Sequence, residues 1–498
     1  MWPTGAPNGE TATASMTASR LRITRAHLLL LLCGLLSLAA YGFAFIAPYN
    51  LYFLTSQGAI PDLGRITGYS PAAFWRYVGC LAALFALYGF GVALAGNLQD
   101  RGSLWVVLGC GLAAALLLVQ VYPYAASDVS LYIVRGRVLG VYGHNSLMVP
   151  PSAFPTETYL PFYSEWADTP SPYGPLWEWI AAGLARLGDG SLLRSLIAFK
   201  ALGVLSYIGC ALLLAAILRA RRSEGTLRGL ILFAWNPLVL LETHAMAHND
   251  LCMVFFALLA LWFWERERYP WVIVSLVLGG LVKYVPFVLL PPTLLLMWRR
   301  LGRRAWLRAV SSGILLSLAP AALTLAPLWR GPKTLSVIGQ MGQIHNSVAA
   351  WVIVALRRFT SIGPVFDLGL WVVRVLFILV YVLVLFGTMR GTSSLIQVYY
   401  RLLYTWLCFG AAAFGYWYIA WLIAMIPLLE SFTTRLFTVV FSWCGLMSVV
   451  LYTFSYDVDA QHVHLIVVPF VFVLPLLAAY ALDRLRYWRR LRRRRNAG

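Results

Sequence analysis

Long apolar runs separated by short polar connections dominate the chain. The runs 27–47, 73–96, 104–123 and 192–218 carry few charged residues, and each is long enough to cross the ~30 Å hydrocarbon core of a bilayer as an α-helix. Helices are expected rather than strands, because the runs lack the ~10-residue alternation of a membrane barrel and a segment in lipid must satisfy its own backbone hydrogen bonds. The pattern therefore predicts an all-α, polytopic membrane protein.

The same pattern predicts about 12 to 14 membrane helices, most of them near the ~20 residues that a span needs. Lys283 and Pro286 interrupt the run 270–298 and divide it into two short halves. We expect a single polytopic membrane domain over 27–482. The expected spans are 27–47, 73–96, 104–123, 192–218, 228–243, 250–264, 270–282, 285–298, 305–328, 365–387, 395–412, 414–430, 434–453 and 462–482.

Basic residues are concentrated in the short connections beside these runs. The chain has a net charge of +20 although only 12% of its residues are charged, against about 25% in soluble domains. Arginines cluster in the N-terminal segment 1–26, the connection 299–308 and the polybasic tail 483–498. Cytoplasmic loops carry such an excess, so we expect a multi-pass protein of the cytoplasmic membrane with both termini in the cytoplasm. We expect the tail to bind anionic membrane lipids, and we expect no nucleic-acid partner.

The long polar segments fall on the opposite side of the predicted membrane. The longest of them, 124–191, is rich in Pro, Tyr, Trp and Ser. Its aromatic content favours an ordered loop with helices lying in the membrane interface. A long loop of this kind in a compact protein is usually functional when it is ordered. Reaction-capable residues are therefore expected on the extracytoplasmic face.

Two common kinds of site have no signature in the sequence. The seven cysteines lie in or beside apolar runs and form no CxxC pair, which indicates buried packing thiols. No GxGxxG, GxxxxGK[ST] or GxSxG motif is present. Nothing therefore indicates a cytosolic site that consumes nucleotides. An enzyme with this layout needs a donor that is available outside, and a lipid-linked donor fits both the side and the membrane depth.

Asp128 lies just outside the third predicted span. A carboxylate at this boundary can take a proton from an incoming hydroxyl, a step worth about 10²- to 10⁴-fold in rate. The alternative is that it caps the helix predicted to follow Ser127. At helical spacing, Asp128, Tyr132 and Arg135 can share one face.

Lys283 and the arginines Arg135 and Arg137 are candidates for binding a phosphate. Lys283 lies within an apolar stretch, where a charge costs about 2.5 to 3.5 kcal/mol at the centre of a membrane helix and is a functional candidate. Cations stabilise the negative charge that develops on a phosphate leaving group. The alternatives are snorkelling of Lys283 to the outer surface and pairing of the arginines with Asp128 or with lipid headgroups.

Glu242, His244, His248 and Asp250 lie close together in the sequence. The i, i+4 spacing of the two histidines can ligate a metal ion, but no third-ligand motif accompanies it. The other readings are hydrogen bonding to a hydroxylated substrate, a structural role, or exposure to water. We expect substrate binding by His248, Asn249 and Asp250 and no obligatory metal or other cofactor, with a divalent metal as an unsupported alternative.

Two aromatic sets complete the candidates. Aromatic faces stack on the C–H faces of sugars, and His or Asn side chains can hydrogen-bond sugar hydroxyls, although aromatic belts at the membrane interface are a common alternative. The further candidate substrate-binding residues are Tyr132, His144, Asn145, Tyr173, Tyr284, Trp417 and Tyr418.

The ordered set of motifs resembles the GT-C superfamily of integral membrane glycosyltransferases. The likeness is greatest to the actinobacterial alpha-mannosyltransferases that use polyprenyl-phosphate mannose, and it extends from about Val121 to about Leu428. The motifs, after Asp128, are Arg135-Gly-Arg137, Tyr142-Gly-His-Asn145, Ser171-Pro-Tyr-Gly-Pro175, Trp235-Asn-Pro237, His248-Asn-Asp250, Val282-Lys-Tyr284 and Tyr416-Trp-Tyr418.

The resemblance implies an inverting transfer on the outer face of the membrane. Asp128 matches the outer-loop base of the superfamily, and the lipid phosphate would leave toward Lys283 and Arg135. Two features depart from the family pattern. Asp128 has no acidic neighbour, and Asn145 is followed by Ser-Leu rather than Pro-Tyr, which leaves the acceptor open.

The sequence therefore predicts a glycosyltransferase that moves a hexose, with mannose favoured, from a polyprenyl-phosphate donor to a glycolipid, glycan or protein acceptor. The main alternative is a transporter or flippase of lipid-linked sugars, which would place polar residues through the membrane depth rather than at one face. A membrane scaffold without chemistry is disfavoured, because Lys283 would then be costly with no role.

Overall fold

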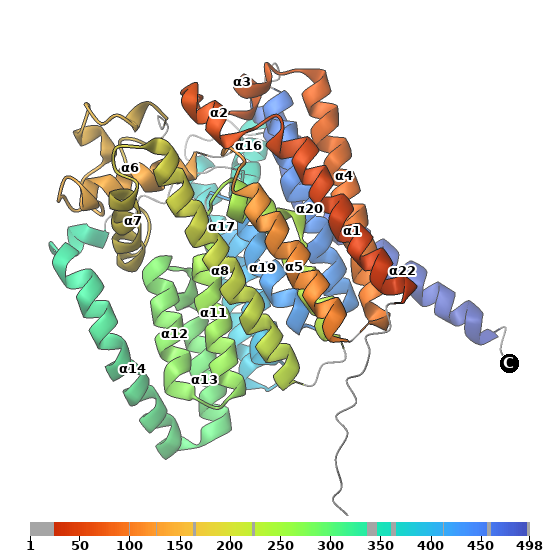
Figure 1. The fold of residues 1–498 in the computed structure, drawn as a ribbon. Coiled ribbons are helices and arrows are strands. Elements are labelled where there is room, and N and C mark those ends of the chain that lie inside the picture. The colour runs from red at the N-terminus through yellow and green to blue at the C-terminus, as the bar shows by residue number, and fades with distance from the viewer. Residues whose placement is uncertain are drawn as a thin grey trace, which may run out of the picture.

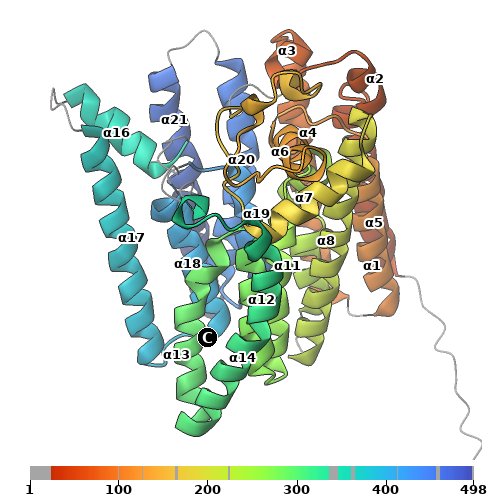
Figure 2. The same ribbon diagram turned by 90° about the vertical axis from the view of Figure 1, so that its left-hand side faces the viewer.

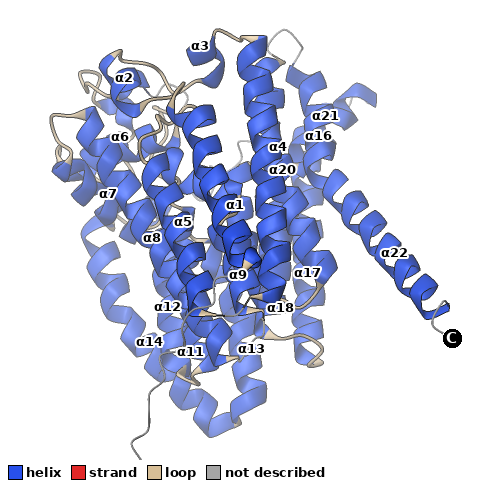
Figure 3. Cartoon of the chain, turned by 45° about the vertical axis from the view of Figure 1, so that its right-hand side comes forward, coloured by secondary structure: helices blue, strands red, loops and turns tan. Residues whose placement is uncertain are grey.

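The computed structural model describes residues 24–98, 100–125, 127–162, 166–221, 225–335, 346–359, 365–411, 413–455 and 460–495. Most of the predicted N-terminal segment 1–26 and the last residues of the tail lie outside these ranges. Throughout the described ranges the regular structure is helical and contains no β-strand (Figure 3). The prediction of an all-α protein is confirmed.

The helices follow the apolar runs of the sequence. The α-helices are α1 (Arg25–Tyr41), α2 (Leu51–Ser56), α3 (Leu63–Thr67), α4 (Pro71–Leu94), α5 (Arg101–Leu118), α6 (Asp128–Gly140), α7 (Pro175–Leu187), α8 (Leu192–Ala220), α9 (Thr226–Ala234), α10 (Pro237–Leu240), α11 (Asp250–Glu265), α12 (Tyr269–Val282), α13 (Leu290–Leu301), α14 (Arg303–Leu325), α16 (Val348–Phe359), α17 (Val365–Met389), α18 (Leu395–Thr405), α19 (Ile419–Met425), α20 (Phe432–Phe454), α21 (Ala460–Phe472) and α22 (Leu474–Arg495). Short 3₁₀ or π turns are η1 (Gly42–Ile46), η2 (Ala95–Asn97), η3 (Pro151–Ala153), η4 (Leu160–Phe162), η5 (Leu241–Ala245), η6 (Val285–Leu289), η7 (Ala326–Leu328), η8 (Pro332–Leu335), η9 (Trp406–Gly410), η10 (Tyr416–Tyr418) and η11 (Ile426–Leu428).

Among the described residues, eight helices have the length and composition to cross a membrane. The polytopic character is thereby confirmed, and the other predicted spans correspond to shorter or broken helices. The eight are Arg25–Ile46, Pro71–Leu94, Arg101–Leu118, Leu192–Ala220, Arg303–Leu328, Leu368–Met389, Phe432–Phe454 and Val463–Arg489, and the shorter apolar helices include Tyr269–Val282, Val348–Arg357 and Tyr416–Leu428.

The predicted span 228–243 is broken into α9, α10 and the π turn η5. Pro237 has no N–H to donate and disfavours helical geometry at the residue before it. Asn236 accepts hydrogen bonds from the backbone of Leu238 and Val239 and so caps the new helix. The hydropathy pattern does not reveal this break, because the residues on both sides of it are apolar. The break leads into the polar segment that follows η5.

The outer loop predicted over 124–191 contains the two helices α6 and α7, in agreement with the ordered loop expected there. They lie with α2 and α3 at one end of the helix bundle, and the α13–α14 connection lies at the other end (Figures 1 and 2). α6 and α7 pack closely because small residues line their contact. A Cβ atom added to Gly136 would lie 2.4 Å from the Ala181 carbonyl oxygen, and one added to Gly140 would lie 2.5 Å from that of Ala182.

We expect Gly136→Ala to destabilise the protein, although alanine is the better helix former by about 1 kcal/mol. The added methyl meets backbone rather than a flexible side chain, and overpacking of this kind typically costs about 1–3 kcal/mol. The thermal unfolding midpoint in detergent should fall. The matched control is Gly183→Ala on α7, where the methyl meets nothing within 4 Å and the midpoint should hold or rise. Equal midpoints for the two variants would contradict the close packing of α6 on α7.

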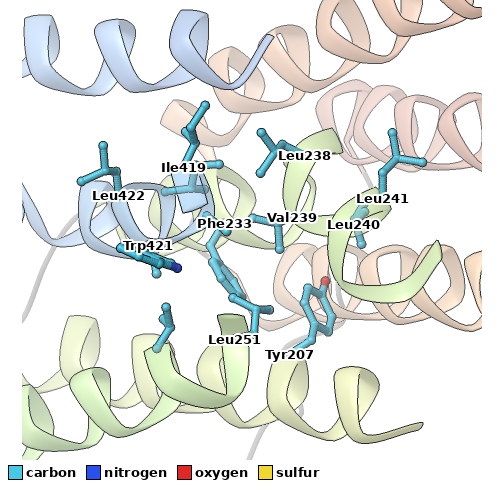
Figure 4. Packing of buried hydrophobic residues seen from close by; sticks show 14 of the residues in the cluster. Tyr207, Phe233, Leu238, Val239, Leu240, Leu241, Leu251, Ile419, Trp421 and Leu422 are labelled. Carbon is cyan, nitrogen blue, oxygen red and sulfur yellow. The ribbon is translucent and has the colours of Figure 1, made fainter. Parts of the chain in front are cut away.

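A buried apolar core joins the central helices behind the outer loop. Side chains of α8, α9, α10, α11 and α19 meet there, and Figure 4 shows Tyr207, Phe233, Val239, Leu251 and Trp421 among them. All five are buried. The core therefore holds α19, which comes late in the chain, against the beginning of α11, where the polar His-Asn-Asp sequence lies.

Candidate active site

Asp128 is the first residue of α6 and faces His248. Its Oδ2 lies 3.6 Å from His248 Nε2, and the Tyr173 hydroxyl donates to its Oδ1 at 3.4 Å. The Asp128 side chain is 22% exposed whereas that of His248 is 1% exposed, so the carboxylate can be reached while its partner cannot. The cap position of α6 belongs to Ser127, and the carboxylate of Asp128 points to side chains of other segments.

His248 is held on its other side by Glu242. Its Nδ1 lies 3.1 Å from Glu242 Oε2 and 3.3 Å from the Glu242 carbonyl oxygen. The imidazole stacks on Trp417 with ring centroids 4.1 Å apart and planes at 14°. The preceding residue, Ala247, has φ 61°, a left-handed conformation that costs a residue with a Cβ about 1–2 kcal/mol. Glu242, His248 and Asp128 therefore form a row in which Glu242 and His248 are buried and Asp128 is partly exposed.

Lys283 ends α12 and forms an ion pair with Asp250. Its Nζ lies 2.8 Å from Asp250 Oδ1, which also accepts the Trp421 indole N–H at 2.6 Å. The ammonium lies 4.3 Å from the centroid of the Tyr418 ring, close enough for a cation–π attraction. The lysine side chain is 12% exposed. It is directed into a cluster of polar and aromatic side chains, which does not support snorkelling.

Tyr173 connects the two charged pairs. Its hydroxyl reaches Asp128, and the Lys283 ammonium lies 5.8 Å from its ring centroid. The same hydroxyl lies 3.3 Å from the Tyr132 hydroxyl, and the Tyr284 hydroxyl donates to the Tyr173 carbonyl oxygen at 3.1 Å. The structure therefore brings together most of the predicted site residues. The set around Tyr173 and His248 consists of Asp128, Tyr132, Tyr173, His248, Asp250, Lys283, Tyr284, Trp417 and Tyr418.

Several buried polar atoms beside this set have no hydrogen-bond partner among the described residues. They include both amide atoms of Asn249 and the Oδ2 atom of Asp250. The two residues are 4% and 3% exposed. Buried polar groups are normally paired, because leaving one unsatisfied costs about 1–3 kcal/mol. These atoms are thus suited to receive hydroxyl groups of a bound ligand.

The two arginines of the Arg-Gly-Arg motif have different surroundings. Arg135 is buried and donates through Nη2 to the carbonyl and hydroxyl oxygens of Thr169, at 3.0 and 2.9 Å, and its charge is close enough to act on Asp128. Arg137 instead pairs with Glu157 at 2.9 Å and with Asp189. Arg137 is therefore a poor candidate for binding the donor phosphate, because Glu157 and Asp189 already neutralise its charge.

His144 and Asn145 also lie outside the set around Asp128. His144 is exposed and packs against Phe154, with ring centroids 5.3 Å apart. The Asn145 amide donates to the Leu328 carbonyl at 2.6 Å and its oxygen accepts from the Leu147 N–H. The described contacts of Asn145 are thus structural and join the predicted outer loop to η7, which follows α14.

His244 and His248 do not converge, despite their spacing. His244 hydrogen-bonds the Leu240 carbonyl at 2.9 Å and packs edge-on against Tyr207, whereas His248 faces Asp128. Across the described part of the chain, no three His, Cys, Asp or Glu side chains are arranged to hold a metal ion. The described contacts of His248 are instead ion-pair contacts with Asp128 and Glu242.

Sequence reasoning missed Lys200. This residue lies within the apolar run of α8 and is fully buried, and its charge within that run was the available signal. Trp421 ends the aromatic sequence 414–421 but was not among the predicted site residues, and the structure adds its hydrogen bond to Asp250. Glu242 was singled out only for its nearness to the histidines, and the structure gives it a partner in His248.

Asp128 and His248, which lie outside the spanning helices, shift each other's pKa. Burial raises the pKa of Asp128, but hydrogen bonding and attraction from His248, with Lys283 and Arg135 further away, outweigh it and hold that pKa below its usual value. Burial lowers the pKa of His248, but its bonds to Asp128 and Glu242 outweigh burial and raise that pKa to about 9. At neutral pH the pair is a carboxylate beside an imidazolium.

This pairing predicts a pH dependence of stability. A histidine whose pKa is raised from 6.5 to about 9 on folding stabilises the fold fully below pH 6.5 and loses that contribution as the pH rises through about 9. The thermal unfolding midpoint of the wild type should therefore fall between these pH values. His248→Gln, which cannot titrate, should show a flatter profile. Parallel profiles for the two proteins would exclude the ion pair.

Comparison with known proteins places this geometry in a family context. Residues 31–300, more than half of the chain, match the model of the MptA_B family, described as "Alpha-(1->6)-mannopyranosyltransferase, N-terminal domain". The matched region includes Asp128, His248 and Lys283. It ends before Trp417, Tyr418 and Trp421, which complete the site from the C-terminal part of the chain.

Individual relatives are distant and partial. Alpha-(1->6)-mannopyranosyltransferase A of Corynebacterium glutamicum is 26% identical over 198 residues, covering 38% of this chain and 39% of that protein. A probable alpha-(1->6)-mannopyranosyltransferase of Mycolicibacterium smegmatis is 26% identical over 262 residues, covering 50% of this chain and 44% of that protein. An alpha-(1->6)-mannopyranosyltransferase of Mycobacterium tuberculosis is 30% identical over 137 residues, 26% of this chain and 22% of that protein. The matches span less than half the length of each relative.

Proposed function

Because the chain belongs to the MptA_B family of alpha-(1->6)-mannopyranosyltransferases, we propose that it is an inverting mannosyltransferase. Its donor is a polyprenyl-phosphate mannose, and its acceptor is a hydroxyl of a glycolipid, glycan or protein at the extracytoplasmic face of the membrane. The observation that carries the proposal is that Tyr173 contacts both a reachable carboxylate, that of Asp128, through its hydroxyl, and the Lys283 ammonium, which lies 5.8 Å from its ring centroid.

The position of the site supports a lipid-borne donor. The α6–α7 region that carries Asp128 lies at the end of the bundle opposite the α13–α14 connection (Figure 2), where Arg299, Arg300, Arg303 and Arg304 cluster. Basic loops are typical of the cytoplasmic side, so the site falls on the side where nucleotide sugars are absent. A donor anchored in the membrane would present its phosphate and sugar at this depth.

The proposed reaction needs one protein base and one phosphate-binding cation. The acceptor oxygen forms a bond to the anomeric carbon of a β-linked mannosyl phosphate while the bond from that carbon to the phosphate oxygen breaks. The electron pair of the broken bond stays on the phosphate, which Lys283 stabilises, and Asp128 takes the proton of the acceptor hydroxyl. Configuration inverts at the anomeric carbon. One base suffices because phosphate is already a good leaving group, unlike the leaving group in hydrolysis of a glycoside.

His248 and Asn249 have distinct tasks in this scheme. The His248 imidazolium keeps Asp128 ionised and oriented until the acceptor arrives. The unpartnered amide of Asn249 and the Oδ2 atom of Asp250 are suited to hydroxyls of the hexose, because a site built to pair polar groups discriminates strongly against ligands that lack them. Trp417, which stacks on His248, and Tyr418, which stacks on Trp421, provide apolar surface for the sugar.

The decisive experiment supplies purified protein with synthetic polyprenyl-phosphate mannose and a panel of mannosyl acceptors, and with GDP-mannose as the comparison donor. We expect transfer from the lipid donor alone, with an α-linked product identified by the anomeric coupling in NMR. Transfer from GDP-mannose alone, or a β-linked product, would exclude the proposal. Movement of the lipid donor across vesicles without any product would favour the transporter instead.

A further inference from the structure

Lys200 of α8 is a fully buried lysine that the proposed reaction does not use. It is 0% exposed, and none of the described carboxylates lies within ion-pairing distance of it. Its ammonium instead donates to three backbone carbonyls: Val121 at 2.8 Å, His244 at 2.7 Å, and Ala245. An ammonium has three donors, so the three carbonyls satisfy all of them.

One carbonyl belongs to the segment that leads into Asp128. The peptide groups around Val121 are themselves fixed, because the Leu51 N–H donates to the Gln120 carbonyl at 2.8 Å and the Tyr122 N–H donates to the Tyr49 carbonyl at 2.6 Å. An antiparallel bridge joins Asn50 to Val121 at the same place. The backbone at Val121, which precedes α6, is therefore held in place where the lysine binds it.

The other two carbonyls belong to the π turn η5, which leads into His248. α8 approaches this turn closely, since a Cβ added to Gly203 would lie 2.6 Å from the Thr243 carbonyl oxygen. Beyond the turn, Ala247 adopts its left-handed conformation. Such a conformation persists only where the surrounding structure imposes it, and the lysine supplies two bonds to the backbone just before it.

We propose that Lys200 is a positioning residue for the Asp128–His248 pair. Its ammonium joins the 121 segment to the 244–245 segment and thereby sets the distance between the carboxylate and the imidazole. This inference rests on the proposed transfer reaction for its kinetic readout, and on the structure alone for its exchange readout.

The kinetic test is a double-mutant cycle with Lys200→Met and His248→Gln. Lys200→Met keeps the length of the side chain but removes every donor. We expect its kcat to fall about 100-fold, the scale of a ~1 Å misplacement of reacting groups, with the donor KM unchanged. If Lys200 acts by placing His248, the second substitution should add little to His248→Gln. If kcat of the double variant falls by the product of the two single-variant losses, the proposal is wrong.

The second readout, hydrogen–deuterium exchange by mass spectrometry, does not require activity. Lys200→Met should speed exchange in residues 241–249, whereas the matched control Tyr207→Phe should not. Tyr207 lies on the same helix and also donates to a buried carbonyl, that of Ala234 at 2.9 Å, which belongs to α9. Unchanged exchange in 241–249 of the lysine variant would overturn the proposal. If the wild type transfers from no lipid donor, the proposed function fails, and this readout still decides the role of Lys200.

If Lys200→Met does not fold, Gly203→Ala tests the same contact with the lysine in place. Its methyl would displace the Thr243 carbonyl of the same turn. We expect the same loss of kcat, the same unchanged KM and the same absence of further loss in the His248→Gln background. The proposal is wrong if Gly203→Ala folds and lowers kcat by the same factor in the His248→Gln background as in the wild type.

Discussion

Asp128→Asn is expected to lower kcat for transfer about 10²- to 10⁴-fold, the range that a positioned general base contributes. Asparagine keeps the shape of the side chain and can still accept from the Tyr173 hydroxyl, but it cannot take a proton from the acceptor. The donor KM should change little, because the described contacts of Asp128 are with His248 and Tyr173 rather than with Lys283. Initial rates with a polyprenyl-phosphate sugar and a saturating acceptor measure both quantities.

Asp62→Asn is the matched control for this substitution. Asp62 precedes α3, which lies at the same end of the bundle as α6 (Figure 1). Its carboxylate accepts from the Arg65 N–H and caps α3, and asparagine caps as well as aspartate. We expect its kcat to match the wild type. Full activity of Asp128→Asn in protein that unfolds at the wild-type temperature would remove Asp128 from the mechanism, whatever the family assignment.

Lys283→Met is expected to lower kcat about 10²- to 10³-fold, as does the loss of one preorganised group that stabilises developing negative charge, and to raise the donor KM. It should also destabilise the protein. Removal of one partner of a buried ion pair leaves the other unpaired and costs about 3–5 kcal/mol, and Asp250 is only 3% exposed. A loss of activity in this variant alone therefore has two readings.

The double variant Lys283→Met with Asp250→Asn separates the two readings. The neutral amide that replaces the carboxylate leaves no unpaired charge, and its oxygen can still accept from the Trp421 indole, so the unfolding midpoint should recover. Activity should not recover, because no cation faces the phosphate. Lys333→Met, at an exposed lysine of η8, is the control and should be neutral in both measurements. Recovery of kcat in the double variant would show that Lys283 serves stability rather than catalysis.

The charged pairs and the tryptophans that contact them come from different parts of the chain. Asp128, His248 and Lys283 lie inside the region matched by the family model, whereas Trp417 stacks on His248 and Trp421 donates to Asp250 from beyond it. The C-terminal part of the chain therefore completes the site. Substitution of Trp421 on α19 should affect transfer even though that helix lies outside the region matched by the N-terminal-domain model.

Much of this protein could be predicted from local sequence. Membrane insertion depends on the summed apolarity of contiguous residues, so the helical, polytopic fold follows from the apolar runs. Asp128 and Lys283 were recognisable for the same reason, since each is a charge at or within an apolar run and such charges are costly without a role. Lys200 is also a charged residue within an apolar run, 192–218, but it was not among the predicted site residues.

The pairing of those charges was decided only by the tertiary structure. Hydropathy is a local sum, but whether an arginine faces a substrate or a carboxylate depends on which distant segment packs against it. Arg135 and Arg137 are nearly adjacent, yet Arg137 is neutralised by Glu157 and Asp189 from the folded outer loop. His248 meets Asp128 because the chain breaks at Pro237 and turns at η5, where Lys200 binds the carbonyls. Such contacts join residues far apart in the sequence, and their energies depend on packing geometry that no local pattern records.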